Sequence, residues 1–353
     1  MKTIEIHASR PYKVSIQAGL LDRTGELLRE RNEAETACLV SGERVNALYG
    51  DRLERALLAA GFRVLRFVHP SGEQHKNLET YGKLMDFLAR EGLGRGDLLV
   101  SLGGGVTGDL TGFAAATYMR GVDYAQIPTS LLAMADASVG GKTAVDLPAG
   151  KNLAGCFWQP LAVFCDPLAL ETLPAEELRC GAAEIVKYAV LRDEKLFEKL
   201  EQKGIAAARS EETLCRCVEI KRDLVEQDEY DRGGRRLLNL GHSFGHALES
   251  CSGYALRHGE AVSAGMVLAA RAAAARGICP IETAEQIAAL LRALGLPTET
   301  DLPAGLLARA MLRDKKRSGG ALPLVLPEAI GRCRIETAPV AELEDWLRAG
   351  GAK

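Results

Sequence analysis

Aromatic residues are scarce in this sequence: Phe, Trp and Tyr together make up 5% of the 353 residues. Alanine, glycine, leucine and valine supply most of the apolar side chains instead, which favours closely packed helices and strands over large aromatic clusters. The apolar fraction is 47%, so the chain can bury a sizeable core. At about 100–200 residues per domain, this length predicts two domains.

The sequence also lacks an excess of charge of either sign, with 44 Lys and Arg against 47 Asp and Glu and a formal net charge of −3. This balance argues against the basic surface of a nucleic-acid-binding protein. No stretch approaches the roughly 20 uninterrupted apolar residues of a membrane span, and the N-terminus has no apolar signal-peptide core. No nucleic-acid or membrane partner is therefore expected.

No Cys-x-x-Cys pair occurs among the nine scattered cysteines, of which Cys215 and Cys217 are the closest two. An odd, scattered set argues against a disulfide framework and against a zinc finger, and it favours a reducing compartment. We therefore expect a cytoplasmic protein.

The first half of the chain alternates between apolar runs and helical patterns. Strands are predicted at 37–40, 62–68, 98–102 and 124–127, and helices at 46–60, 78–90 and 106–119. Strands that alternate with helices indicate βαβ units and a largely parallel sheet. The N-terminal residues 1–14 also alternate like a strand.

Beyond about residue 172 the pattern becomes helical. Helices are predicted at 193–203, 209–228, 242–252, 259–276, 281–294 and 303–313, and only 322–335 looks extended. We therefore predict an α/β plus all-α protein with two domains. The first is a Rossmann-like parallel-sheet domain over residues 1–171, the second is a helical domain over residues 172–353, and the active site lies in the cleft between them.

A glycine-rich segment follows the predicted strand 98–102. Residues 103–109, GGGVTGD, match G-x-G-x-x-G directly after a strand and before a helix. Glycines let the backbone approach a pyrophosphate, and a helix N-terminus supplies free N–H groups. A turn without a ligand is the alternative, and no clear acidic residue follows about 20 residues later as in the common fingerprint. The flanking strand and helix favour a dinucleotide.

Two lysines lie in glycine-flanked loops, Lys142 in GGKT and Lys151 directly after Gly150. Lysine acts as a mobile point charge and suits an anionic group such as phosphate. GGKT also suggests a P-loop, but Asp136 replaces the first glycine of that motif, which argues against nucleotide hydrolysis. A solvated surface charge is the alternative for each lysine alone.

Three of the six histidines, His242, His246 and His258, lie within 17 residues. The first two are four apart and share one face if they lie on a helix. Glu184 stands in an otherwise apolar helical stretch, where a carboxylate is costly unless it is paired or bound to a metal. Two or three histidines with one carboxylate describe a catalytic zinc site. The spacing leaves open whether Glu184 pairs only with Lys187 and whether His246 is a ligand.

Taken together, these segments resemble the 3-dehydroquinate synthase family over nearly the whole chain. Six segments follow the order and spacing of that family: GGGVTGDLTGFAAATYMRG, PTSLLAMADASVGGKTAVDLPAGKNLAG, AAEIVKYAVL, NLGHSFGHALE, HGEAV and DKK. Each segment alone is weak evidence for the family, but six segments in the same order are highly specific for it. The chain departs from the family at Ala137, where many relatives have Ser, at Ser130, a frequent Thr, and at Asp231, usually a Glu.

The resemblance implies roles for the matching residues. Zinc or cobalt would be held by Glu184, His242 and His258, and His246 would contact the substrate. NAD would be contacted by Ser71, Gly72, Glu73, Gln74, His75, Lys76, Gly105, Val106, Thr107, Gly108, Asp109, Thr129, Ser130, Lys142, Lys151, Ala169, Leu170, Glu171 and Thr172. The catalytic residues around the substrate would be Asp136, Lys142, Asn152, Lys187, Lys221, Arg235, Asn239 and His246. The phosphate would be bound by Arg120, Lys142, Lys151, Asn152 and one of Lys315 and Lys316.

The family is a lyase of the shikimate pathway, in aromatic amino-acid biosynthesis, that converts 3-deoxy-D-arabino-heptulosonate 7-phosphate to 3-dehydroquinate and phosphate. The resemblance implies that NAD acts as a catalyst, oxidising the C5 hydroxyl before phosphate elimination and returning the hydride before the aldol closure. A metal would polarise the C5 oxygen as a Lewis acid. Arg235 and Lys221 would clamp the carboxylate. We expect a homodimer.

Three alternatives predict different properties. Another sugar-phosphate cyclase, acting on a substrate without a carboxylate, would leave Lys221 and Arg235 unsatisfied. A metal-dependent polyol or alcohol dehydrogenase would need no phosphate cluster and would accumulate NADH. A regulatory nucleotide-binding module would not explain metal ligands together with a basic cluster.

Overall fold

A computed structural model describes residues 1–312 and 320–353. The chain divides into two compact units, the first of Met1–Leu173 with Leu214–Tyr230 and the second of Pro174–Thr213 with Asp231–Lys353. The first change of unit falls close to the predicted boundary. The return of 214–230 to the first unit differs from the predicted division, which placed all residues after 171 in the second domain.

Segment 214–230 contains most of helix α8 (Glu211–Gln227) and joins the first unit through side chains near its end. The carboxylate of Glu226 accepts a hydrogen bond from the backbone N–H of His7 at 2.7 Å. Glu229 accepts from the backbone N–H and the hydroxyl of Ser9, at 2.7 and 2.6 Å. These contacts span more than 200 residues of sequence, so a local helical pattern carries no sign of them.

The first unit is built on a seven-stranded sheet with the order β1-β2-β9-β6-β5-β3-β4. Its strands are β1 (Lys2–Ile6), β2 (Tyr12–Ile16), β3 (Thr36–Gly42), β4 (Arg63–His69), β5 (Leu98–Gly103), β6 (Asp123–Pro128) and β9 (Ala162–Cys165). The pair β1–β2 is antiparallel, and all the remaining neighbouring pairs are parallel. The predicted parallel-sheet domain is confirmed.

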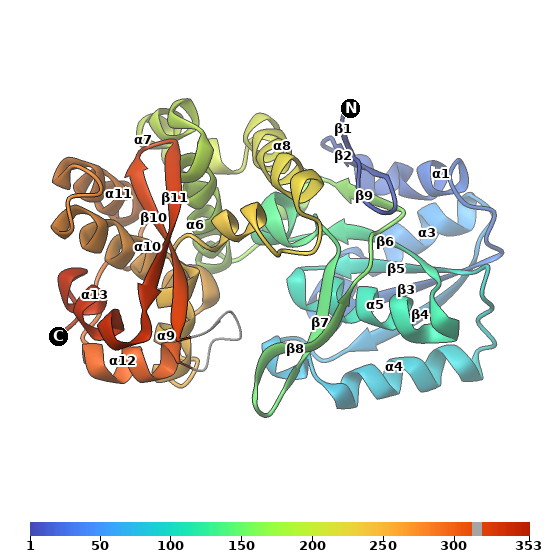
Figure 1. The fold of residues 1–353 in the computed structure, drawn as a ribbon. Coiled ribbons are helices and arrows are strands. Elements are labelled where there is room, and N and C mark those ends of the chain that lie inside the picture. Colours follow the sequence, from blue (N-terminus) through green and yellow to red (C-terminus); the bar gives the residue numbers. More distant parts are fainter. Residues whose placement is uncertain (313–319) are drawn as a thin grey trace. The chain divides into compact units, whose positions relative to one another are not determined.

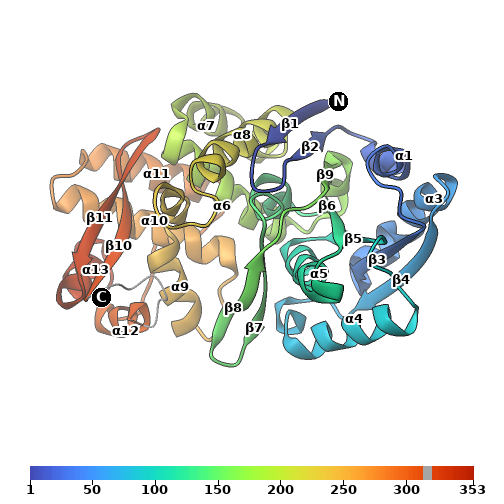
Figure 2. The same cartoon turned by 45° about the vertical axis from the view of Figure 1, so that its right-hand side comes forward.

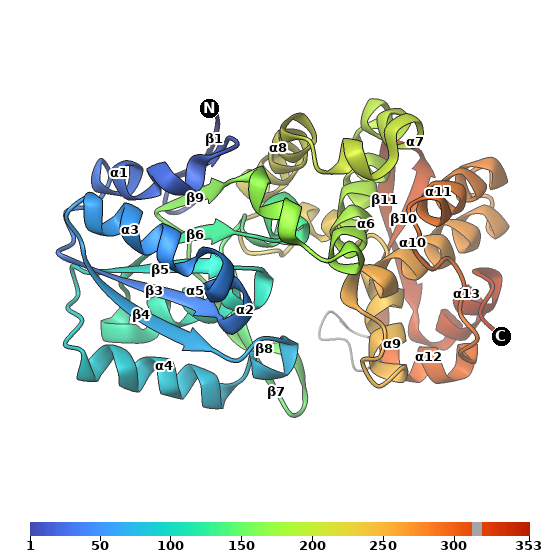
Figure 3. The ribbon, with the colours of Figure 1, turned by 180° about the vertical axis from the view of Figure 1, so that it is seen from behind.

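Helices cover both faces of this sheet. Helices α1 (Thr24–Arg29) and α3 (Asp51–Ala59) pack on the face that includes Leu39. Helices α4 (Leu78–Arg90) and α5 (Gly105–Thr117) pack on the opposite face, with Val40. Figures 1 and 3 show the two pairs on opposite sides of the strands. Strands buried on both faces are apolar at successive positions, which is why the apolar runs located them.

Two stretches of the first unit differ from the predicted pattern. The predicted helix 46–60 consists of a π-helical segment (Asn46–Gly50) and α3, and the short helix α2 (Glu43–Val45) precedes it. The glycine-flanked lysines, predicted in loops, lie on an antiparallel hairpin of β7 (Lys142–Leu147) and β8 (Gly150–Phe157). Ala, Gly, Lys and Asp have low strand propensity, so no strand was predicted there. The hairpin forms because it packs along α5, with Val145 buried (Figure 2).

The second unit is mostly helical. It contains α6 (Ala175–Arg192), α7 (Glu194–Ala208), α9 (His242–Cys251), α10 (His258–Ala275), α11 (Ile281–Ala293), α12 (Ala304–Met311) and α13 (Leu343–Ala349). The predicted extended stretch 322–335 lies in an antiparallel hairpin of β10 (Ala321–Ala329) and β11 (Arg332–Pro339). One core joins α9, α10, α12, α13 and the apolar face of β10. Across 1–312 and 320–353, no helix has the length and apolar content to span a bilayer.

Candidate active site

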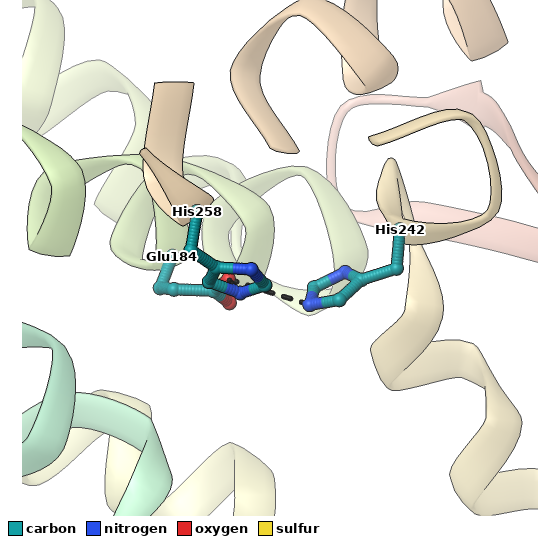
Figure 4. A group of neighbouring side chains, drawn as sticks. All are labelled: Glu184, His242 and His258. Carbon is teal, nitrogen blue, oxygen red and sulfur yellow. Dashed lines mark ion pairs between the residues drawn. The ribbon is translucent and has the colours of Figure 1, made fainter. Parts of the chain in front are cut away.

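Glu184, His242 and His258 converge within the second unit (Figure 4). Glu184 lies in the middle of α6, and the two histidines are the first residues of α9 and α10. Nε2 of His242 lies 3.5 Å from Glu184 Oε1, and Nε2 of His258 lies 3.4 Å from the same oxygen. One ligand atom from each residue lies within 4.8 Å of the others. Three segments distant in sequence therefore present their ligand atoms to one point.

The surroundings of Glu184 fit a divalent metal. Both carboxylate oxygens are buried and, within the described part of the chain, accept no hydrogen bond of good geometry. Lys187 Nζ lies 2.5 Å away, and the two side chains are each 1% exposed. The ion pair between Glu184 and Lys187, which the sequence left open, is therefore present together with the two histidines. Two imidazoles and one carboxylate, with room for a further ligand, are the donor set of a catalytic zinc site, and cobalt accepts the same donors.

Glycines set the close approach of the helices that carry these ligands. A Cβ on Gly259 would lie 2.3 Å from the backbone oxygen of Cys180 in α6. Gly241, at φ +77°, would place a Cβ 2.7 Å from the backbone oxygen of Val262 in α10. Only glycine fits at such backbone contacts. The start of α10 is therefore fixed against α6, and the start of α9 against α10.

Each of the two histidines near Glu184 has a second contact through its other ring nitrogen. His242 Nδ1 lies 3.1 Å from the backbone oxygen of Leu240, and His258 Nδ1 lies 3.2 Å from Glu249 Oε1. Burial lowers the pKa of His258, but contacts with Glu184 and Glu249 outweigh burial and raise the pKa to about 10 in the metal-free protein. Sequence reasoning did not identify Glu249. Its signal is its spacing, three residues after His246 and seven after His242, on one helix face.

Three more predicted site residues of the second unit, Arg235, Asn239 and His246, lie close to His242 in sequence. Arg235 and Asn239 belong to a 3₁₀ helix (Gly234–Asn239), which packs against α6 and the β10–β11 hairpin. Arg235 is 1% exposed, and Asn239 donates to the backbone oxygen of Arg236 at 3.0 Å. His246 is exposed, with its ring centroid 5.5 Å from that of His242. Lys315 and Lys316 lie outside the described residues.

In the first unit, the segments predicted to contact NAD follow the carboxyl ends of parallel strands. Segment 71–76 follows β4, 105–109 follows β5, 129–130 follows β6, and 169–172 follows β9. Ligands of open parallel sheets bind at this edge, where the loops after neighbouring strands meet. The backbone N–H of Thr129 donates to the oxygen of Gly103 at 2.9 Å, so the β5 and β6 loops touch.

The glycine loop fits a pyrophosphate. Helix α5 starts at Gly105 and has no acidic residue in its first turn, so no carboxylate of that turn competes with a ligand for its free N–H groups. Space around the loop is limited, because a Cβ on Gly104 would lie 3.2 Å from Ser130 Oγ and one on Gly108 would lie 2.7 Å from Gln126 Oε1. The glycines therefore allow α5 to pack closely on the sheet, and they would also allow the close approach of a pyrophosphate.

A buried lysine joins three of the predicted segments. Lys76 Nζ lies 2.5 Å from Asp109 Oδ2 and donates to Asn152 Oδ1 at 2.6 Å. Burial alone would lower the pKa of Lys76, but the carboxylates of Asp109 and Glu73 outweigh it and raise this pKa. Lys151 lies 3.6 Å from Glu73. Ion pairs and a hydrogen bond thus connect the loop after β4 with the glycine loop and with the β7–β8 hairpin.

The other predicted residues of the first unit fall in three places. Lys221 on α8 forms a close ion pair with Asp136 and donates to the backbone oxygen of Asp136 at 2.8 Å. Lys142 is exposed at the start of β7. Arg120 is exposed beyond the carboxyl end of α5, whereas the glycine loop forms the amino end of that helix. At about 1.5 Å per residue, the helix separates Arg120 from the glycine loop by roughly 20 Å.

His69, which the sequence did not single out, supports the glycine loop from the end of β4. It is buried, with Nδ1 2.8 Å from the backbone oxygen of Pro70 and Nε2 3.1 Å from Thr107 Oγ1. A ring that donates from Nδ1 to the Pro70 oxygen leaves Nε2 to accept from the Thr107 hydroxyl. A neutral imidazole therefore satisfies both contacts.

We expect His69 to make the stability of the protein depend on pH. Burial lowers the pKa of His69 below its usual value of 6.5. The unfolded chain therefore takes up this proton more readily, and the free energy of unfolding should fall as pH drops below about 6.5. Urea unfolding at pH 7.5 and 5.5 should show a larger loss for the unmodified protein than for His69→Gln. Equal losses would show that His69 does not carry this dependence.

Comparisons with known proteins agree on one family. Sequence models of the 3-dehydroquinate synthase N-terminal and C-terminal domains match residues 66–180 and 181–317. The 3-dehydroquinate synthase of Enterococcus faecalis is 42% identical, over 99% of this chain and 100% of that protein. The 3-dehydroquinate synthase of Caulobacter vibrioides is 46% identical, over 91% of each chain.

Solved structures of sugar-phosphate cyclases share the fold. The 2-epi-5-epi-valiolone synthase of Streptomyces hygroscopicus, with NAD⁺ and Zn²⁺ bound, has a TM-score of 0.88 and 29% identity, covering 98% of each chain. A 2-deoxy-scyllo-inosose synthase complexed with carbaglucose-6-phosphate, NAD⁺ and Co²⁺ also has a TM-score of 0.88, with 25% identity, covering 98% of this chain and 99% of that chain. With two domain models that together match most of its length, and with these relatives, the chain belongs to the 3-dehydroquinate synthase family.

Proposed function

We propose that this chain converts 3-deoxy-D-arabino-heptulosonate 7-phosphate to 3-dehydroquinate and phosphate in the shikimate pathway, with NAD and a zinc or cobalt ion as cofactors. Family membership at 42–46% identity supports the reaction. The convergence of Glu184, His242 and His258 is the observation that carries the proposal, because this donor set suits a reaction in which a hydroxyl oxygen must be polarised.

The cofactors supply chemistry that side chains lack. NAD accepts a hydride and returns it, and a divalent metal acts as a Lewis acid at an oxygen of the substrate. In the second unit, Glu184, His242 and His258 would hold the metal, with His246 and Lys187 near the substrate. In the first unit, the segments after β4, β5, β6 and β9 would hold NAD.

The basic residues would bind the two anionic groups of the substrate. Lys142, Lys151 and Asn152 of the β7–β8 hairpin would bind the phosphate, and Lys221 and Arg235 the carboxylate. Lys221 is already paired with Asp136. It would therefore share its charge between that carboxylate and the substrate, whereas the planar fork of Arg235 would grip a carboxylate through two parallel bonds.

The experiment that tests this function is a turnover assay with the heptulosonate phosphate, zinc and NAD in catalytic amount. Phosphate release should far exceed the NAD supplied, without a steady rise in NADH absorbance, and the product mass should be that of 3-dehydroquinate. One NADH formed per product would instead identify a polyol or alcohol dehydrogenase. Turnover of a neutral sugar phosphate in preference to the sugar acid would identify another cyclase.

Replacement of Arg235 should separate this activity from that of cyclases with neutral substrates. A bidentate charged contact contributes about 1.5–3 kcal/mol, so Arg235→Lys should lower kcat/KM at least tenfold or so for the natural substrate. The loss should be much smaller for an analogue without the C1 carboxylate. Because Arg235 is buried, the lysine variant is preferable to Arg235→Ala, which leaves a cavity. Equal losses on both substrates would mean that Arg235 has a structural role only.

A homodimer and a cytoplasmic location belong to the same proposal. The cytoplasmic location is supported by the cysteines, all nine of which carry thiols. Light scattering coupled to gel filtration should give twice the mass of the 353-residue chain. A monomeric mass at micromolar concentration would contradict the homodimer.

A further inference from the structure

Glu249 is a buried carboxylate for which the proposed reaction provides no role. It is 3% exposed and lies on α9, on the helix face that also carries His242 and His246. A buried carboxylate is costly unless a cation or hydrogen-bond donors compensate it. Its position beside the proposed metal ligands, next to apolar core residues such as Phe244 and Leu248, therefore requires an explanation.

Glu249 contacts the ring nitrogen of His258 that faces away from Glu184. Glu249 Oε1 lies 3.2 Å from Nδ1 of His258, while Nε2 of the same ring lies 3.4 Å from Glu184 Oε1. The two ring nitrogens of a neutral histidine differ, because one carries the proton and the other is free to bind a metal. A hydrogen bond donated from Nδ1 to Glu249 leaves the lone pair on Nε2, on the side of Glu184.

We propose that Glu249 is a positioning residue of the metal site, which fixes the tautomer and the ring orientation of His258 and increases the basicity of its Nε2. This inference rests on the metal site proposed above. A ligand histidine commonly donates its second N–H to a carboxylate or a backbone oxygen, and such partners strengthen metal binding. In this chain the two ligand histidines differ: His242 faces the neutral backbone oxygen of Leu240, and His258 faces a carboxylate from another helix.

One competing arrangement uses the same residues. His246, Glu249 and His258 also place ligand atoms within 4.8 Å of one another, so they could hold a second metal. That arrangement would require Nδ1 of His258 as a metal ligand, which removes its hydrogen bond to Glu249. The geometry around Glu184 favours a single metal, because His242 and His258 both direct Nε2 toward Glu184. Metal stoichiometry distinguishes the two arrangements.

The test measures zinc and cobalt binding to the full-length protein with Glu249→Gln and Glu249→Ala. Zinc affinity from chelator competition should fall roughly 10- to 100-fold in Glu249→Ala. It should fall less in Glu249→Gln, whose amide oxygen can still accept from Nδ1. The visible absorption of bound Co²⁺ should change in both variants, because it reports the ligand geometry. A residue that serves only folding would lower the melting temperature without changing the cobalt spectrum.

Glu260→Gln is the matched control. Glu260 lies two residues after His258 and its carboxylate accepts from the backbone N–H of Arg257 at 2.9 Å, without contact with the imidazole. The Glu260→Gln substitution removes one negative charge close to His258 but no contact with its ring. The zinc affinity of this variant should therefore be nearly unchanged. Full zinc affinity in a folded Glu249→Gln and Glu249→Ala would overturn the inference, as would two zinc ions in the unmodified protein and one in Glu249→Ala. An unmodified protein that binds no zinc or cobalt would instead refute the metal site itself.

Discussion

Replacing His258 with Ala should remove most of the bound metal and lower kcat by at least about 1,000-fold, with the fold retained. His258 is one of three groups that present ligand atoms to a single point. Removal of a direct ligand should exceed the roughly 10- to 100-fold loss of metal affinity expected for an outer partner. Lewis-acid stabilisation amounts to several kcal/mol, and about 4 kcal/mol corresponds to roughly 1,000-fold in rate. Metal content by mass spectrometry and single-turnover rates measure the two effects.

His246→Gln is the control for this prediction. His246 lies four residues after His242, is exposed, and does not belong to the group formed with Glu184. The variant should keep about one metal per chain while its turnover falls, since the residue is proposed to contact the substrate. Stoichiometric zinc in His258→Ala, or loss of zinc in His246→Gln, would refute the assignment of ligands.

A single methyl group at residue 259 should disrupt the same site from the backbone side. A Cβ on Gly259 would lie 2.3–2.6 Å from three backbone atoms of Cys180, which cannot move away like the end of a side chain. Gly259→Ala must therefore separate the start of α10 from α6, and with it His258 from Glu184. Overpacking costs about 1–3 kcal/mol and more where backbone must shift, so we expect a loss of about 3 kcal/mol in stability. Zinc affinity should fall with it.

Gly82→Ala provides the opposite expectation for the same substitution. Gly82 lies inside α4, and a Cβ there would meet no atom within 4 Å. Alanine at this half-buried helix position, where its methyl group meets no other atom, should raise stability by about 0.5–1 kcal/mol. Urea unfolding of both variants, together with zinc titration, checks the pair. A Gly259→Ala protein with unchanged stability and zinc affinity would show that α10 and α6 can separate without cost to the site.

The central strands of the sheet could be predicted from the sequence because nearly all of their residues are buried. Strands β3, β5 and β6 were located by apolar runs because helices cover both faces of the sheet. The β7–β8 hairpin was not found, because its residues Lys142–Leu147 and Gly150–Phe157 have weak strand propensity and are held by packing on α5. Helix α8 was located, but its unit depends on the contacts of Glu226 and Glu229 with the N-terminal hairpin, which no local pattern encodes.

Only part of the candidate site could be predicted from the sequence, for a similar reason. The proposed ligands Glu184, His242 and His258 occur in short segments that match the family, so the resemblance could mark them. Glu249 and His69 act through contacts with other side chains, with His258 and Thr107. Such contacts depend on how helices and loops pack, and a glutamate in a helix or a histidine at a strand end has no pattern that reveals them.

The division of the first unit into two stretches of chain has a consequence for biosynthesis. Leu214–Tyr230 supplies the buried side chains of Leu224 and Val225 and the carboxylates that hold the backbone of His7 and Ser9. Domains generally fold as the ribosome releases them, from the N-terminus onward. Here the first unit stays incomplete until the chain has been translated through Tyr230, well into the second unit. A recombinant fragment that stops at Leu173 would lack that helix, so an isolated first unit would have to be made by joining two separate pieces.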